Sequence, residues 1–410
     1  MSMNRRRFLS IAATSAAAAS PVSRLLAQIS LGKSARTGSI IDGAALVATT
    51  DRTRILKAAN AYLTEQPITV TASHATRSPG GPHDYFSQGD YWWPNPKDSN
   101  APYIQRDGET NPENFEEHRT AMRRLSVQVP ALVAAYVLTR DERYARHAAL
   151  HLRAWFVTPA TRMNPNLEYS QTVIGMKALR GIGIIDTLHL VEVARAAGFL
   201  QHSKALPSKE YAAVQGWFAE YLTWLTTSPR GLSEQSQKNN HGACWVLQVT
   251  AFSGFTGNTQ QIAFCRDRFK TVLVPNQIAP DGSLPLELRR TKPYSYSIFC
   301  LDVLADLCQL LSTPADNLWE FKGPNGAGIH EAIAFLYPYL KDKNKWPYPH
   351  DVQHWDDFPA RQPNLLFGGL AYNNLDYIAL WKTLNPDPTV EEVIRNFPVR
   401  QPLLWVKQPA

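Results

Sequence analysis

A short polar stretch, Lys238 to Gly242, lies between two apolar runs of helical character. Asn240 and His241 at its centre place an amide and an imidazole side by side. A polar group that is buried without a partner costs about 1–3 kcal/mol, so these side chains need a local role. They either cap a helix, with the histidine bonded for structural reasons, or line a site in which a ligand supplies the partners.

A second polar cluster lies further along the chain and complements the first. Residues 287–291 read Glu-Leu-Arg-Arg-Thr, and Tyr294 and Tyr296 follow just beyond them. The two clusters together supply an amide, an imidazole, a guanidinium and a phenol. Such a set suits the removal of a proton from a carbon beside a carboxylate. The arginines could also form ion pairs with Glu287 on a solvated surface.

The chain has 410 residues, of which 44% are hydrophobic, and it can bury a large core in one domain or two. Its start predicts an export signal. Arg5–Arg7 precede a small apolar run at 11–19, and Leu25–Ala27 offer a cleavage site. The apolar run is too short to anchor the chain in a bilayer. We therefore expect residues 1–27 to be a twin-arginine signal peptide and the protein to be periplasmic or secreted, without a membrane anchor.

Removal of that segment would delete four arginines and no acidic residue, so the formal net charge of +7 would fall to +3. No Lys/Arg stripe, zinc-ligand spacing or recognition helix stands out, which disfavours nucleic acid as a partner. Four cysteines are scattered through apolar segments without a CxxC pair, so we expect buried free thiols, although an oxidising compartment would permit a disulfide. They are Cys244, Cys265, Cys300 and Cys308.

Residues 78–114 differ from the rest of the chain because they are rich in Pro, Gly and Asn. This composition excludes regular helix, and a loop of such length in a compact domain is usually functional. Three consecutive aromatic residues, Tyr91, Trp92 and Trp93, lie within it. They either stack against the faces of sugar rings or pack the loop onto the helical body.

The other segments predict helices. We expect residues 28–50 to form a linker, 51–65 a first helix, and a further helix to start at Pro112, where Asn precedes the proline and glutamates follow. Apolar positions recur at helical spacing and nowhere alternate with period two. This pattern predicts one all-α domain over 51–400, with helices paired into hairpins and wrapped in a ring. The amphipathic runs cover about 141–157, 169–197, 209–226, 241–253, 259–274, 297–312, 328–340 and 365–383.

Eight motifs in order carry a resemblance to a known family. They are His83-Asp84-Tyr85, Gly89 to Pro94, Arg106 to Pro112, Met163-Asn164-Pro165 with Tyr169 and Gln171, Gly181 to Thr187, Asn239 to Gly242, Asp281-Gly282-Ser283, and Glu287 to Thr291. From about residue 75 to residue 382 the chain resembles the alginate lyase superfamily of α/α-toroid polysaccharide lyases. The resemblance implies an incomplete (α/α) toroid, secretion, and β-elimination on a 4-linked uronic acid polymer such as alginate or glucuronan.

By this resemblance, Asn240 and His241 fall on the Asn-His pair of the family, and Arg290 and Tyr296 fall on its arginine and tyrosine. These four residues are the predicted catalytic groups. The residues that we expect to contact the anionic polysaccharide are Tyr91, Trp92, Trp93, Arg106, Gln171, Asn239, Arg289 and Tyr294.

Elimination makes definite demands on these groups. The C5 proton of a uronate is weakly acidic while the neighbouring carboxylate is ionised, because its removal would build a dianion. Asn240, through hydrogen bonds, and Arg290, through its charge, can neutralise that carboxylate. His241 can serve as the base or as a further donor. The phenol of Tyr296, stabilised as phenolate by a nearby guanidinium, can protonate the departing O4.

Stereochemistry leaves the base open. In mannuronate and glucuronate the C5 hydrogen and O4 lie on the same side, so one tyrosine can act as base and then as acid. In guluronate they lie on opposite sides, and His241 would have to be the base. Neither route requires a metal or another cofactor.

Two other functions fit the same sequence. An inverting glycoside hydrolase on a helical toroid would need two opposed carboxylates, for which Glu234, Asp281 and Glu287 are available. A periplasmic polysaccharide-binding protein would keep the aromatic residues without catalysis.

Overall fold

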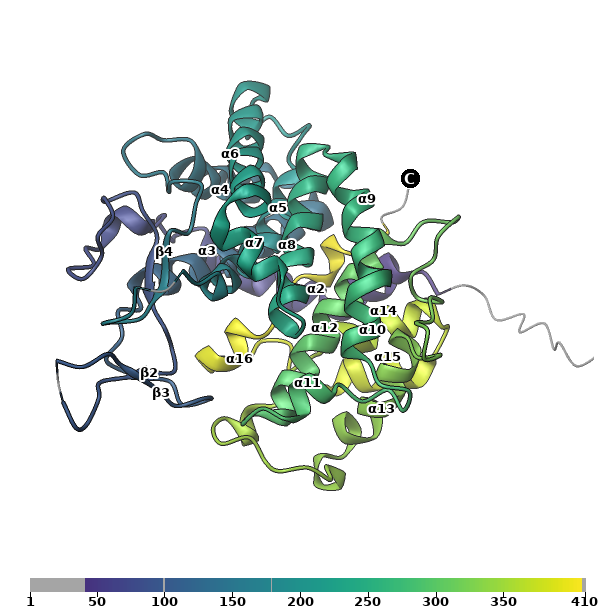
Figure 1. Ribbon diagram of the computed structural model, residues 1–410. Helices are drawn as coiled ribbons and strands as arrows, with labels where there is room; N and C mark the ends of the chain where they lie inside the picture. Colours follow the sequence, from purple (N-terminus) through teal and green to yellow (C-terminus); the bar gives the residue numbers. More distant parts are fainter. Residues whose placement is uncertain (1–40, 99, 178, 408–410) are drawn as a thin grey trace, which may run out of the picture. The chain divides into compact units, whose positions relative to one another are not determined.

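The computed structural model describes residues 41–98, 100–177 and 179–407. The expected signal peptide, residues 1–27, lies outside the described residues, as do residues 28–40 of the expected linker. Described residues fold into one packed unit that is mostly helical (Figure 1).

The helices are α2 (Gly43–Tyr62), α3 (Glu117–Thr139), α4 (Glu142–Phe156), α5 (Leu190–Gly198), α6 (Ser208–Thr227), α7 (Pro229–Gln235), α8 (Asn240–Thr256), α9 (Thr259–Arg268), α10 (Val274–Gln277), α11 (Pro285–Leu288), α12 (Pro293–Leu311), α13 (Ile329–Lys341), α14 (Pro363–Ala371), α15 (Leu375–Thr383) and α16 (Glu391–Arg395). Short 3-10 turns are η1 (Val70–Ala72), η2 (Ile182–His189), η4 (Lys343–Lys345), η5 (Trp355–Asp357) and η6 (Pro402–Leu404), and η3 (Phe269–Leu273) is a π-helical turn. The strands are β1 (Phe86–Gln88), β2 (Trp92–Trp93), β3 (Ile104–Gln105) and β4 (Tyr169–Thr172).

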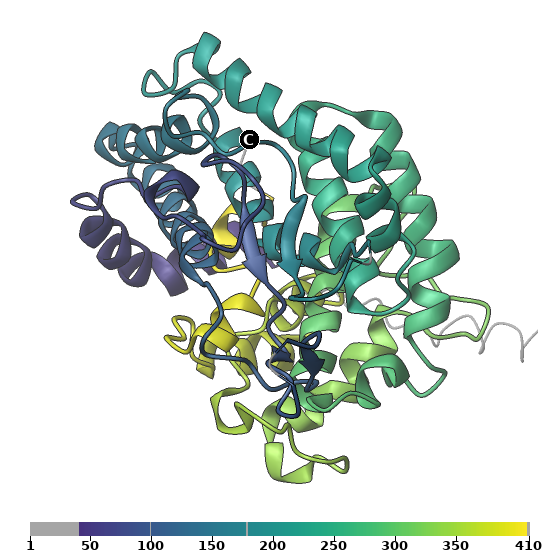
Figure 2. The same ribbon diagram turned by 60° about the vertical axis from the view of Figure 1, so that its left-hand side comes forward.

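The helices form an inner row and an outer row. In the inner row α3, α5, α8, α12 and α14 each contact the next, and successive helices pair as hairpins, namely α3 with α4, α8 with α9, α12 with α13 and α14 with α15. The arrangement curves around the centre of the molecule in both ribbon views (Figures 1 and 2). This incomplete (α/α) toroid confirms the predicted all-α fold class.

The inner helices α8 and α12 are buried along nearly their whole length, which is typical of helices that are apolar on most faces. By length and composition α12 could cross a membrane, but 89% of its apolar window is buried inside the protein. It is therefore a core helix. The four cysteines are free and buried, as expected.

Helix α8 begins where the polar stretch is. The Asn239 side chain accepts a hydrogen bond from the backbone N–H of His241, so Asn239 is the N-cap. Gly257 ends the helix at a positive φ of 75°, which glycine adopts without strain. Asn240 and His241 therefore occupy the first turn of α8. The polar stretch fulfils both predicted roles, because it starts a helix and, as shown below, also lines a cavity.

Four short strands hold the irregular segments 78–114 and 169–181 in place. Strand β1 pairs with β4 in parallel, and β2 pairs with β3 in antiparallel fashion. The first pair lies near the centre of Figure 2, framed by helices. The segment with β2 and β3 lies in front of the inner helices in that view, where it can form one wall of a site.

Several predicted boundaries were wrong. The first helix begins at Gly43, so residues 43–50 are helical and do not belong to the linker. The helix expected from Pro112 starts at Glu117. The run at 169–197 divides into β4, η2 and α5. At the C-terminal end, ordered packing continues past residue 400, where Leu404 and Trp405 are buried.

Candidate active site

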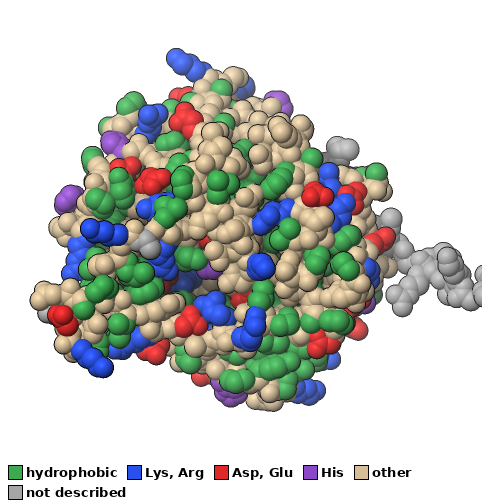
Figure 3. Space-filling view, viewed as in Figure 1, with side chains coloured by type: hydrophobic (Ala, Val, Ile, Leu, Met, Phe, Trp, Pro, Cys, Tyr) green, Lys and Arg blue, Asp and Glu red, His purple; other side chains and the backbone are tan. Residues whose placement is uncertain are grey.

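One cavity of about 360 Å³ lies between the β2–β3 segment and the starts of α8 and α12, with α16 beside it. Basic side chains gather around a hollow on this face, left of centre in Figure 3. Its lining residues are Asp90, Tyr91, Trp92, Gln105, Asp107, Gln171, Arg180, Ile182, Ile185, Asn239, Asn240, His241, Arg290, Tyr296, Phe299, Arg395 and Asn396. All four predicted catalytic residues are among them.

Asn240 is fixed by a buried carboxylate. Its backbone N–H donates to Oε1 of Glu287 at 2.8 Å, and its Nδ2 donates to Oε2 of the same side chain at 2.6 Å. Burial raises the pKa of Glu287, and the two hydrogen bonds from Asn240 oppose that shift. Because the Asn240 Nδ2 carries two hydrogens, one remains for a ligand in the cavity.

His241 is held in the same way by a different acid. Its Nδ1 lies 2.6 Å from Oε1 of Glu234, a side chain that is fully buried. A carboxylate accepts only, so Nδ1 carries the proton in the neutral ring and Nε2 keeps its lone pair. This tautomer is the one that a proton acceptor needs.

Arg290 reaches the cavity from the turn after α11. Its Nη2 and Nε donate to the two oxygens of Asp107 at 2.7 and 3.1 Å, and the Thr291 hydroxyl also bonds to Asp107. Burial would raise the pKa of Asp107, but the hydrogen bonds from Arg290 and Thr291 hold it below its ordinary value. The pair is therefore ionised at neutral pH, and its fork geometry fixes the guanidinium.

Tyr296, in the first turn of α12, lies between a cation and a second phenol. The guanidinium of Arg290 lies 4.5 Å above its ring centroid, and its hydroxyl is 2.6 Å from the hydroxyl of Tyr91. Burial raises the pKa of Tyr296 well above its ordinary value, Tyr91 adds to the shift, and Arg290 opposes it. In the free protein Tyr296 is therefore a neutral phenol that can donate a proton.

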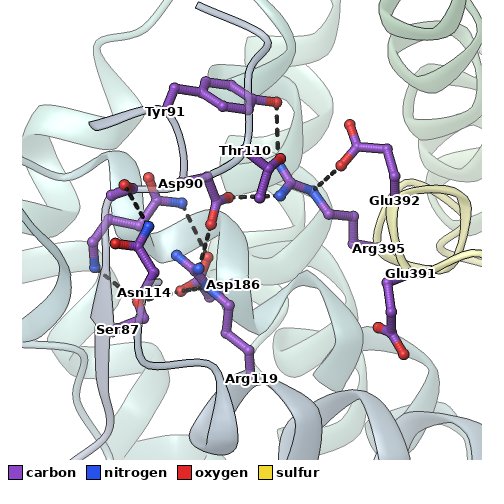
Figure 4. A network of polar contacts seen from close by, with 12 residues as sticks. Ser87, Asp90, Tyr91, Thr110, Asn114, Arg119, Asp186, Glu391, Glu392 and Arg395 are labelled. Atoms are coloured by element: carbon purple, nitrogen blue, oxygen red, sulfur yellow. Dashed lines mark hydrogen bonds and ion pairs between the residues drawn. The ribbon is translucent and has the colours of Figure 1, made fainter. Parts of the chain in front are cut away.

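A buried charge network supports Tyr91 from behind (Figure 4). Arg395 donates from Nη1 to Asp90 at 2.7 Å and from Nη2 to the Tyr91 hydroxyl at 3.2 Å. Arg119 contacts Asp90 and, through Nε at 3.1 Å, Asp186. The Tyr91 oxygen thus accepts a hydrogen bond from Arg395 and also shares one with the Tyr296 hydroxyl, in which either oxygen can be the donor.

Gln171 belongs to the same network. Its Nε2 donates to Oδ1 of Asp186 at 3.0 Å, and its φ of 44° is unusual for a residue with a side chain. Such conformations cluster at functional sites. Gln171 and Asn239, two of the predicted substrate-contacting residues, thus line the cavity together with Tyr91 and Trp92.

The other four predicted contacts, Trp93, Arg106, Arg289 and Tyr294, lie outside this lining. Tyr294 is fully buried, donates to the backbone carbonyl of Tyr339 and packs against Trp346, so its predicted role in substrate binding is corrected to one in the core.

Trp93 and Arg106 pair with each other outside the lining, with the guanidinium 4.7 Å from the ring centroid. Arg289 is likewise not part of the lining. Of the two adjacent arginines and the two tyrosines, Arg290 and Tyr296 are therefore the members that face the cavity.

Several lining residues were not predicted. Asp107 lies within the motif Arg106 to Pro112 and could have been predicted as the partner of a catalytic arginine. Arg180 and Arg395 carried no local motif. The structure alone places Arg395 beside Tyr91 and Asp90, from which it is separated by more than three hundred positions.

The acids proposed for a hydrolase are not arranged as an opposed pair in the cavity. Glu234 and Glu287 are buried beneath His241 and Asn240, and Asp281 binds Ser283 in a turn that does not contribute to the lining. The two acids that do line it, Asp90 and Asp107, are each paired with arginine. The carboxylates therefore act as partners of other groups.

An incomplete ring of helical hairpins around a cavity with an amide, an imidazole, a guanidinium and a phenol defines an α/α-toroid enzyme. The family model for alginate lyase matches residues 69–346. The crystal structure of an alginate lyase from Bacteroides ovatus is 31% identical, with a TM-score of 0.77 over 93% of this chain and 97% of that chain. The chain therefore belongs to the alginate lyase family and is a polysaccharide lyase.

More distant structures share the fold. Alginate lyase A1-III from Sphingomonas species A1 is 17% identical, with a TM-score of 0.53 over 90% of this chain and 97% of that one. A histidine-to-alanine variant of alginate lyase A1-III, complexed with a tetrasaccharide, is 16% identical, with a TM-score of 0.55 over 91% of this chain and 98% of that one. A search of curated proteins finds no match.

Proposed function

We propose that this lyase cleaves a 4-linked uronic acid polymer, either alginate or glucuronan, by β-elimination, and leaves a 4,5-unsaturated uronate at the new end. The observation that carries this proposal is the meeting of Asn240, His241, Arg290 and Tyr296 in one cavity. Two of these four groups rest on buried carboxylates that hold them ready. The tetrasaccharide bound by alginate lyase A1-III supports an oligosaccharide of this kind as ligand.

The carboxylate of the reacting uronate would lie against Asn240 and Arg290. Asn240 offers the second hydrogen of Nδ2, because the first one is bound to Glu287. Arg290 uses Nε and Nη2 for Asp107, so its Nη1 is the nitrogen that meets the substrate. A hydrogen bond and a positive charge together stabilise the dianion that forms as the C5 proton leaves.

His241 would take the C5 proton. Its Nδ1 is committed to Glu234, and the Nε2 lone pair is the free basic site. When the ring accepts the proton, the buried carboxylate of Glu234 stabilises the imidazolium that forms. This division suits guluronate, in which the C5 hydrogen and O4 lie on opposite sides.

Tyr296 would protonate O4 as the glycosidic bond breaks. The phenolate that remains lies under the Arg290 guanidinium and can accept a hydrogen bond from Tyr91. A second route, in which Tyr296 acts as base and then as acid on mannuronate or glucuronate, requires the phenol to lose its proton first; Arg290 favours that loss, whereas burial and Tyr91 oppose it. In that route His241 is a donor to the carboxylate.

The predicted export agrees with this function. The twin-arginine pattern at Arg5–Arg7 predicts delivery to the periplasm or beyond, where a polymer substrate is accessible.

The experiment is incubation of the purified protein with guluronate-rich and mannuronate-rich alginate, glucuronan and hyaluronan. Near-ultraviolet absorbance reports the unsaturated product, and a reducing-sugar assay reports every cleavage. We expect absorbance and reducing ends to rise together on at least one uronate polymer. New reducing ends without absorbance would instead identify a hydrolase, and bound but intact polymer would identify a binding protein.

A further inference from the structure

The cations that line the cavity differ in their partners. Arg290 is paired with Asp107, and Arg395 is paired with Asp90. Arg180 has no ion pair with a carboxylate among the described residues, and its Nη1 is buried without a hydrogen-bond partner. A buried donor without a partner is costly in a folded protein. A bound anion that accepts hydrogen bonds from this guanidinium would therefore stabilise it.

The position of Arg180 is fixed by an aromatic ring. Its guanidinium lies 5.0 Å from the ring centroid of Trp92. Near the indole lies Gly89, where a Cβ would come within 2.5 Å of the Trp92 Cδ1. Glycine at 89 thus allows the backbone to approach the indole closely, and Trp92 is used to orient Arg180. A guanidinium that stacks by its face keeps its edge donors free for a planar carboxylate.

The reacting uronate does not need Arg180, because Asn240 and Arg290 already provide for its carboxylate. Arg180 belongs to the segment after β4, whereas those two residues belong to α8 and to the turn after α11. Arg180 therefore reaches the same cavity from a third element.

On the basis of the proposed function, we propose that Arg180, oriented by Trp92, binds the carboxylate of a uronate adjacent to the one that reacts. This subsite makes the enzyme selective for polymers in which consecutive sugars are uronates. A polymer with neutral sugars between its uronates, such as hyaluronan, leaves Arg180 without an anion and binds less tightly.

Glu234 offers a competing explanation. Burial lowers the pKa of Arg180, and the charge of Glu234 opposes that shift. Since Glu234 also holds His241, Arg180 could act on the base instead of the substrate. That role would change the pH dependence of kcat on every substrate, whereas a subsite changes KM only where a neighbouring carboxylate is present.

The test uses Arg180→Gln, which removes the charge and keeps a polar side chain. Arg106→Gln is the matched control, because Arg106 stacks on the neighbouring Trp93 in the same manner but lies outside the cavity. The substrates are a polyuronate that the wild type cleaves and the same polymer partly carboxyl-reduced, so that many uronates have neutral neighbours. Circular dichroism confirms that both variants are folded.

For Arg180→Gln we expect KM on the intact polymer to rise about 10-fold or more, with kcat changed by less than about 3-fold, since one charge-assisted contact is lost. On the reduced polymer the variant and the wild type should differ far less. Arg106→Gln should match the wild type on both.

Two results would overturn the subsite. One is an unchanged KM on the intact polymer. The other is an equal loss on both polymers with a shifted pH profile of kcat, which would assign Arg180 to the Glu234–His241 pair. Failure of the proposed function is a separate outcome, because the wild type would then release no unsaturated product from any uronate polymer.

Discussion

The two walls of the cavity are built differently. On the helical wall, Asn240 and His241 in the first turn of α8 each rest on a carboxylate, Glu287 or Glu234, of which at most 1% is exposed. On the loop wall, Asp107 comes from the irregular segment 78–114, and its side chain remains 28% exposed.

The difference separates two tasks. Buried partners in a water-poor interior hold the helical wall in one geometry, as groups that move protons require. On the loop wall the Asp107–Arg290 pair is partly solvated and therefore individually weaker, although Asp90 in the same segment is buried in its pairs with Arg119 and Arg395. Changes on the helical wall should therefore stop the chemistry, while changes on the loop wall should alter affinity.

The largest effect is expected from the groups that handle protons. We expect Tyr296→Phe and His241→Ala each to lower kcat by about 10²–10⁴-fold, because each removes a group that transfers a proton. The fold and polymer binding should be retained. Absorbance of the unsaturated product measures kcat, and circular dichroism checks the fold.

Tyr294→Phe is the control for Tyr296→Phe. The hydroxyl that it removes lies in the same helix turn, but this hydroxyl donates to the Tyr339 carbonyl and does not face the cavity. Its kcat should remain near that of the wild type. Full activity in Tyr296→Phe, or equal losses in both tyrosine variants, would contradict the assignment of Tyr296.

A smaller loss is expected when the support beneath Asn240 is changed. Glu287→Gln replaces one accepting oxygen by an NH₂ group that faces the Asn240 donors, so one buried hydrogen bond is lost. We expect kcat to fall about 10–100-fold and the free energy of unfolding to fall by about 1–3 kcal/mol. Kinetics on the preferred polymer and thermal unfolding measure the two effects.

Asp281→Asn is the matched control, because Asp281 binds only the nearby Ser283 in a turn outside the lining. It should leave kcat unchanged. If Asp281→Asn stopped turnover while Glu287→Gln did not, the carboxylates would have roles closer to those in a hydrolase, and the supporting role of Glu287 would be wrong.

The sequence predicted the helical part of the fold well where the apolar period was strong. Helices α6, α8 and α13 lie within a few residues of the expected runs. The prediction of one helix failed at 169–197, because the apolar residues there are buried by contacts between a strand and a 3-10 turn and not on one face of a helix. Gly183 in η2 packs closely on β4, because a Cβ at this position would lie 2.2 Å from Ser170 Oγ, so the segment forms a strand and a 3-10 turn in contact with each other.

The same limit applies to the site. Asn240, His241, Arg290 and Tyr296 could be named because the first three lie in compact polar motifs, Tyr296 follows one closely, and all four match residues of the resembled family. Arg395 could not be named, because its partner Asp90 lies 305 positions away and nothing local marks the pair. Tyr294 was misplaced for a related reason: two positions that are two residues apart in the first turn of a helix point in different directions, and the sequence does not say which one faces the ligand.

The smallest effect concerns the two neighbouring tryptophans of the loop wall. Trp92 lines the cavity and makes a cation–π contact with Arg180. Trp93 makes the same kind of contact with Arg106 outside the lining, and its Nε1 donates to the Glu109 carbonyl. We expect Trp92→Ala to raise KM by about 3–10-fold with little change in kcat, because an aromatic support for a cation is worth about 0.5–2 kcal/mol. Trp93→Ala should leave KM nearly unchanged. Initial rates over a range of polymer concentrations distinguish the two variants. An equal rise in KM for both would mean that the two tryptophans only hold the loop in place and that neither contacts the substrate.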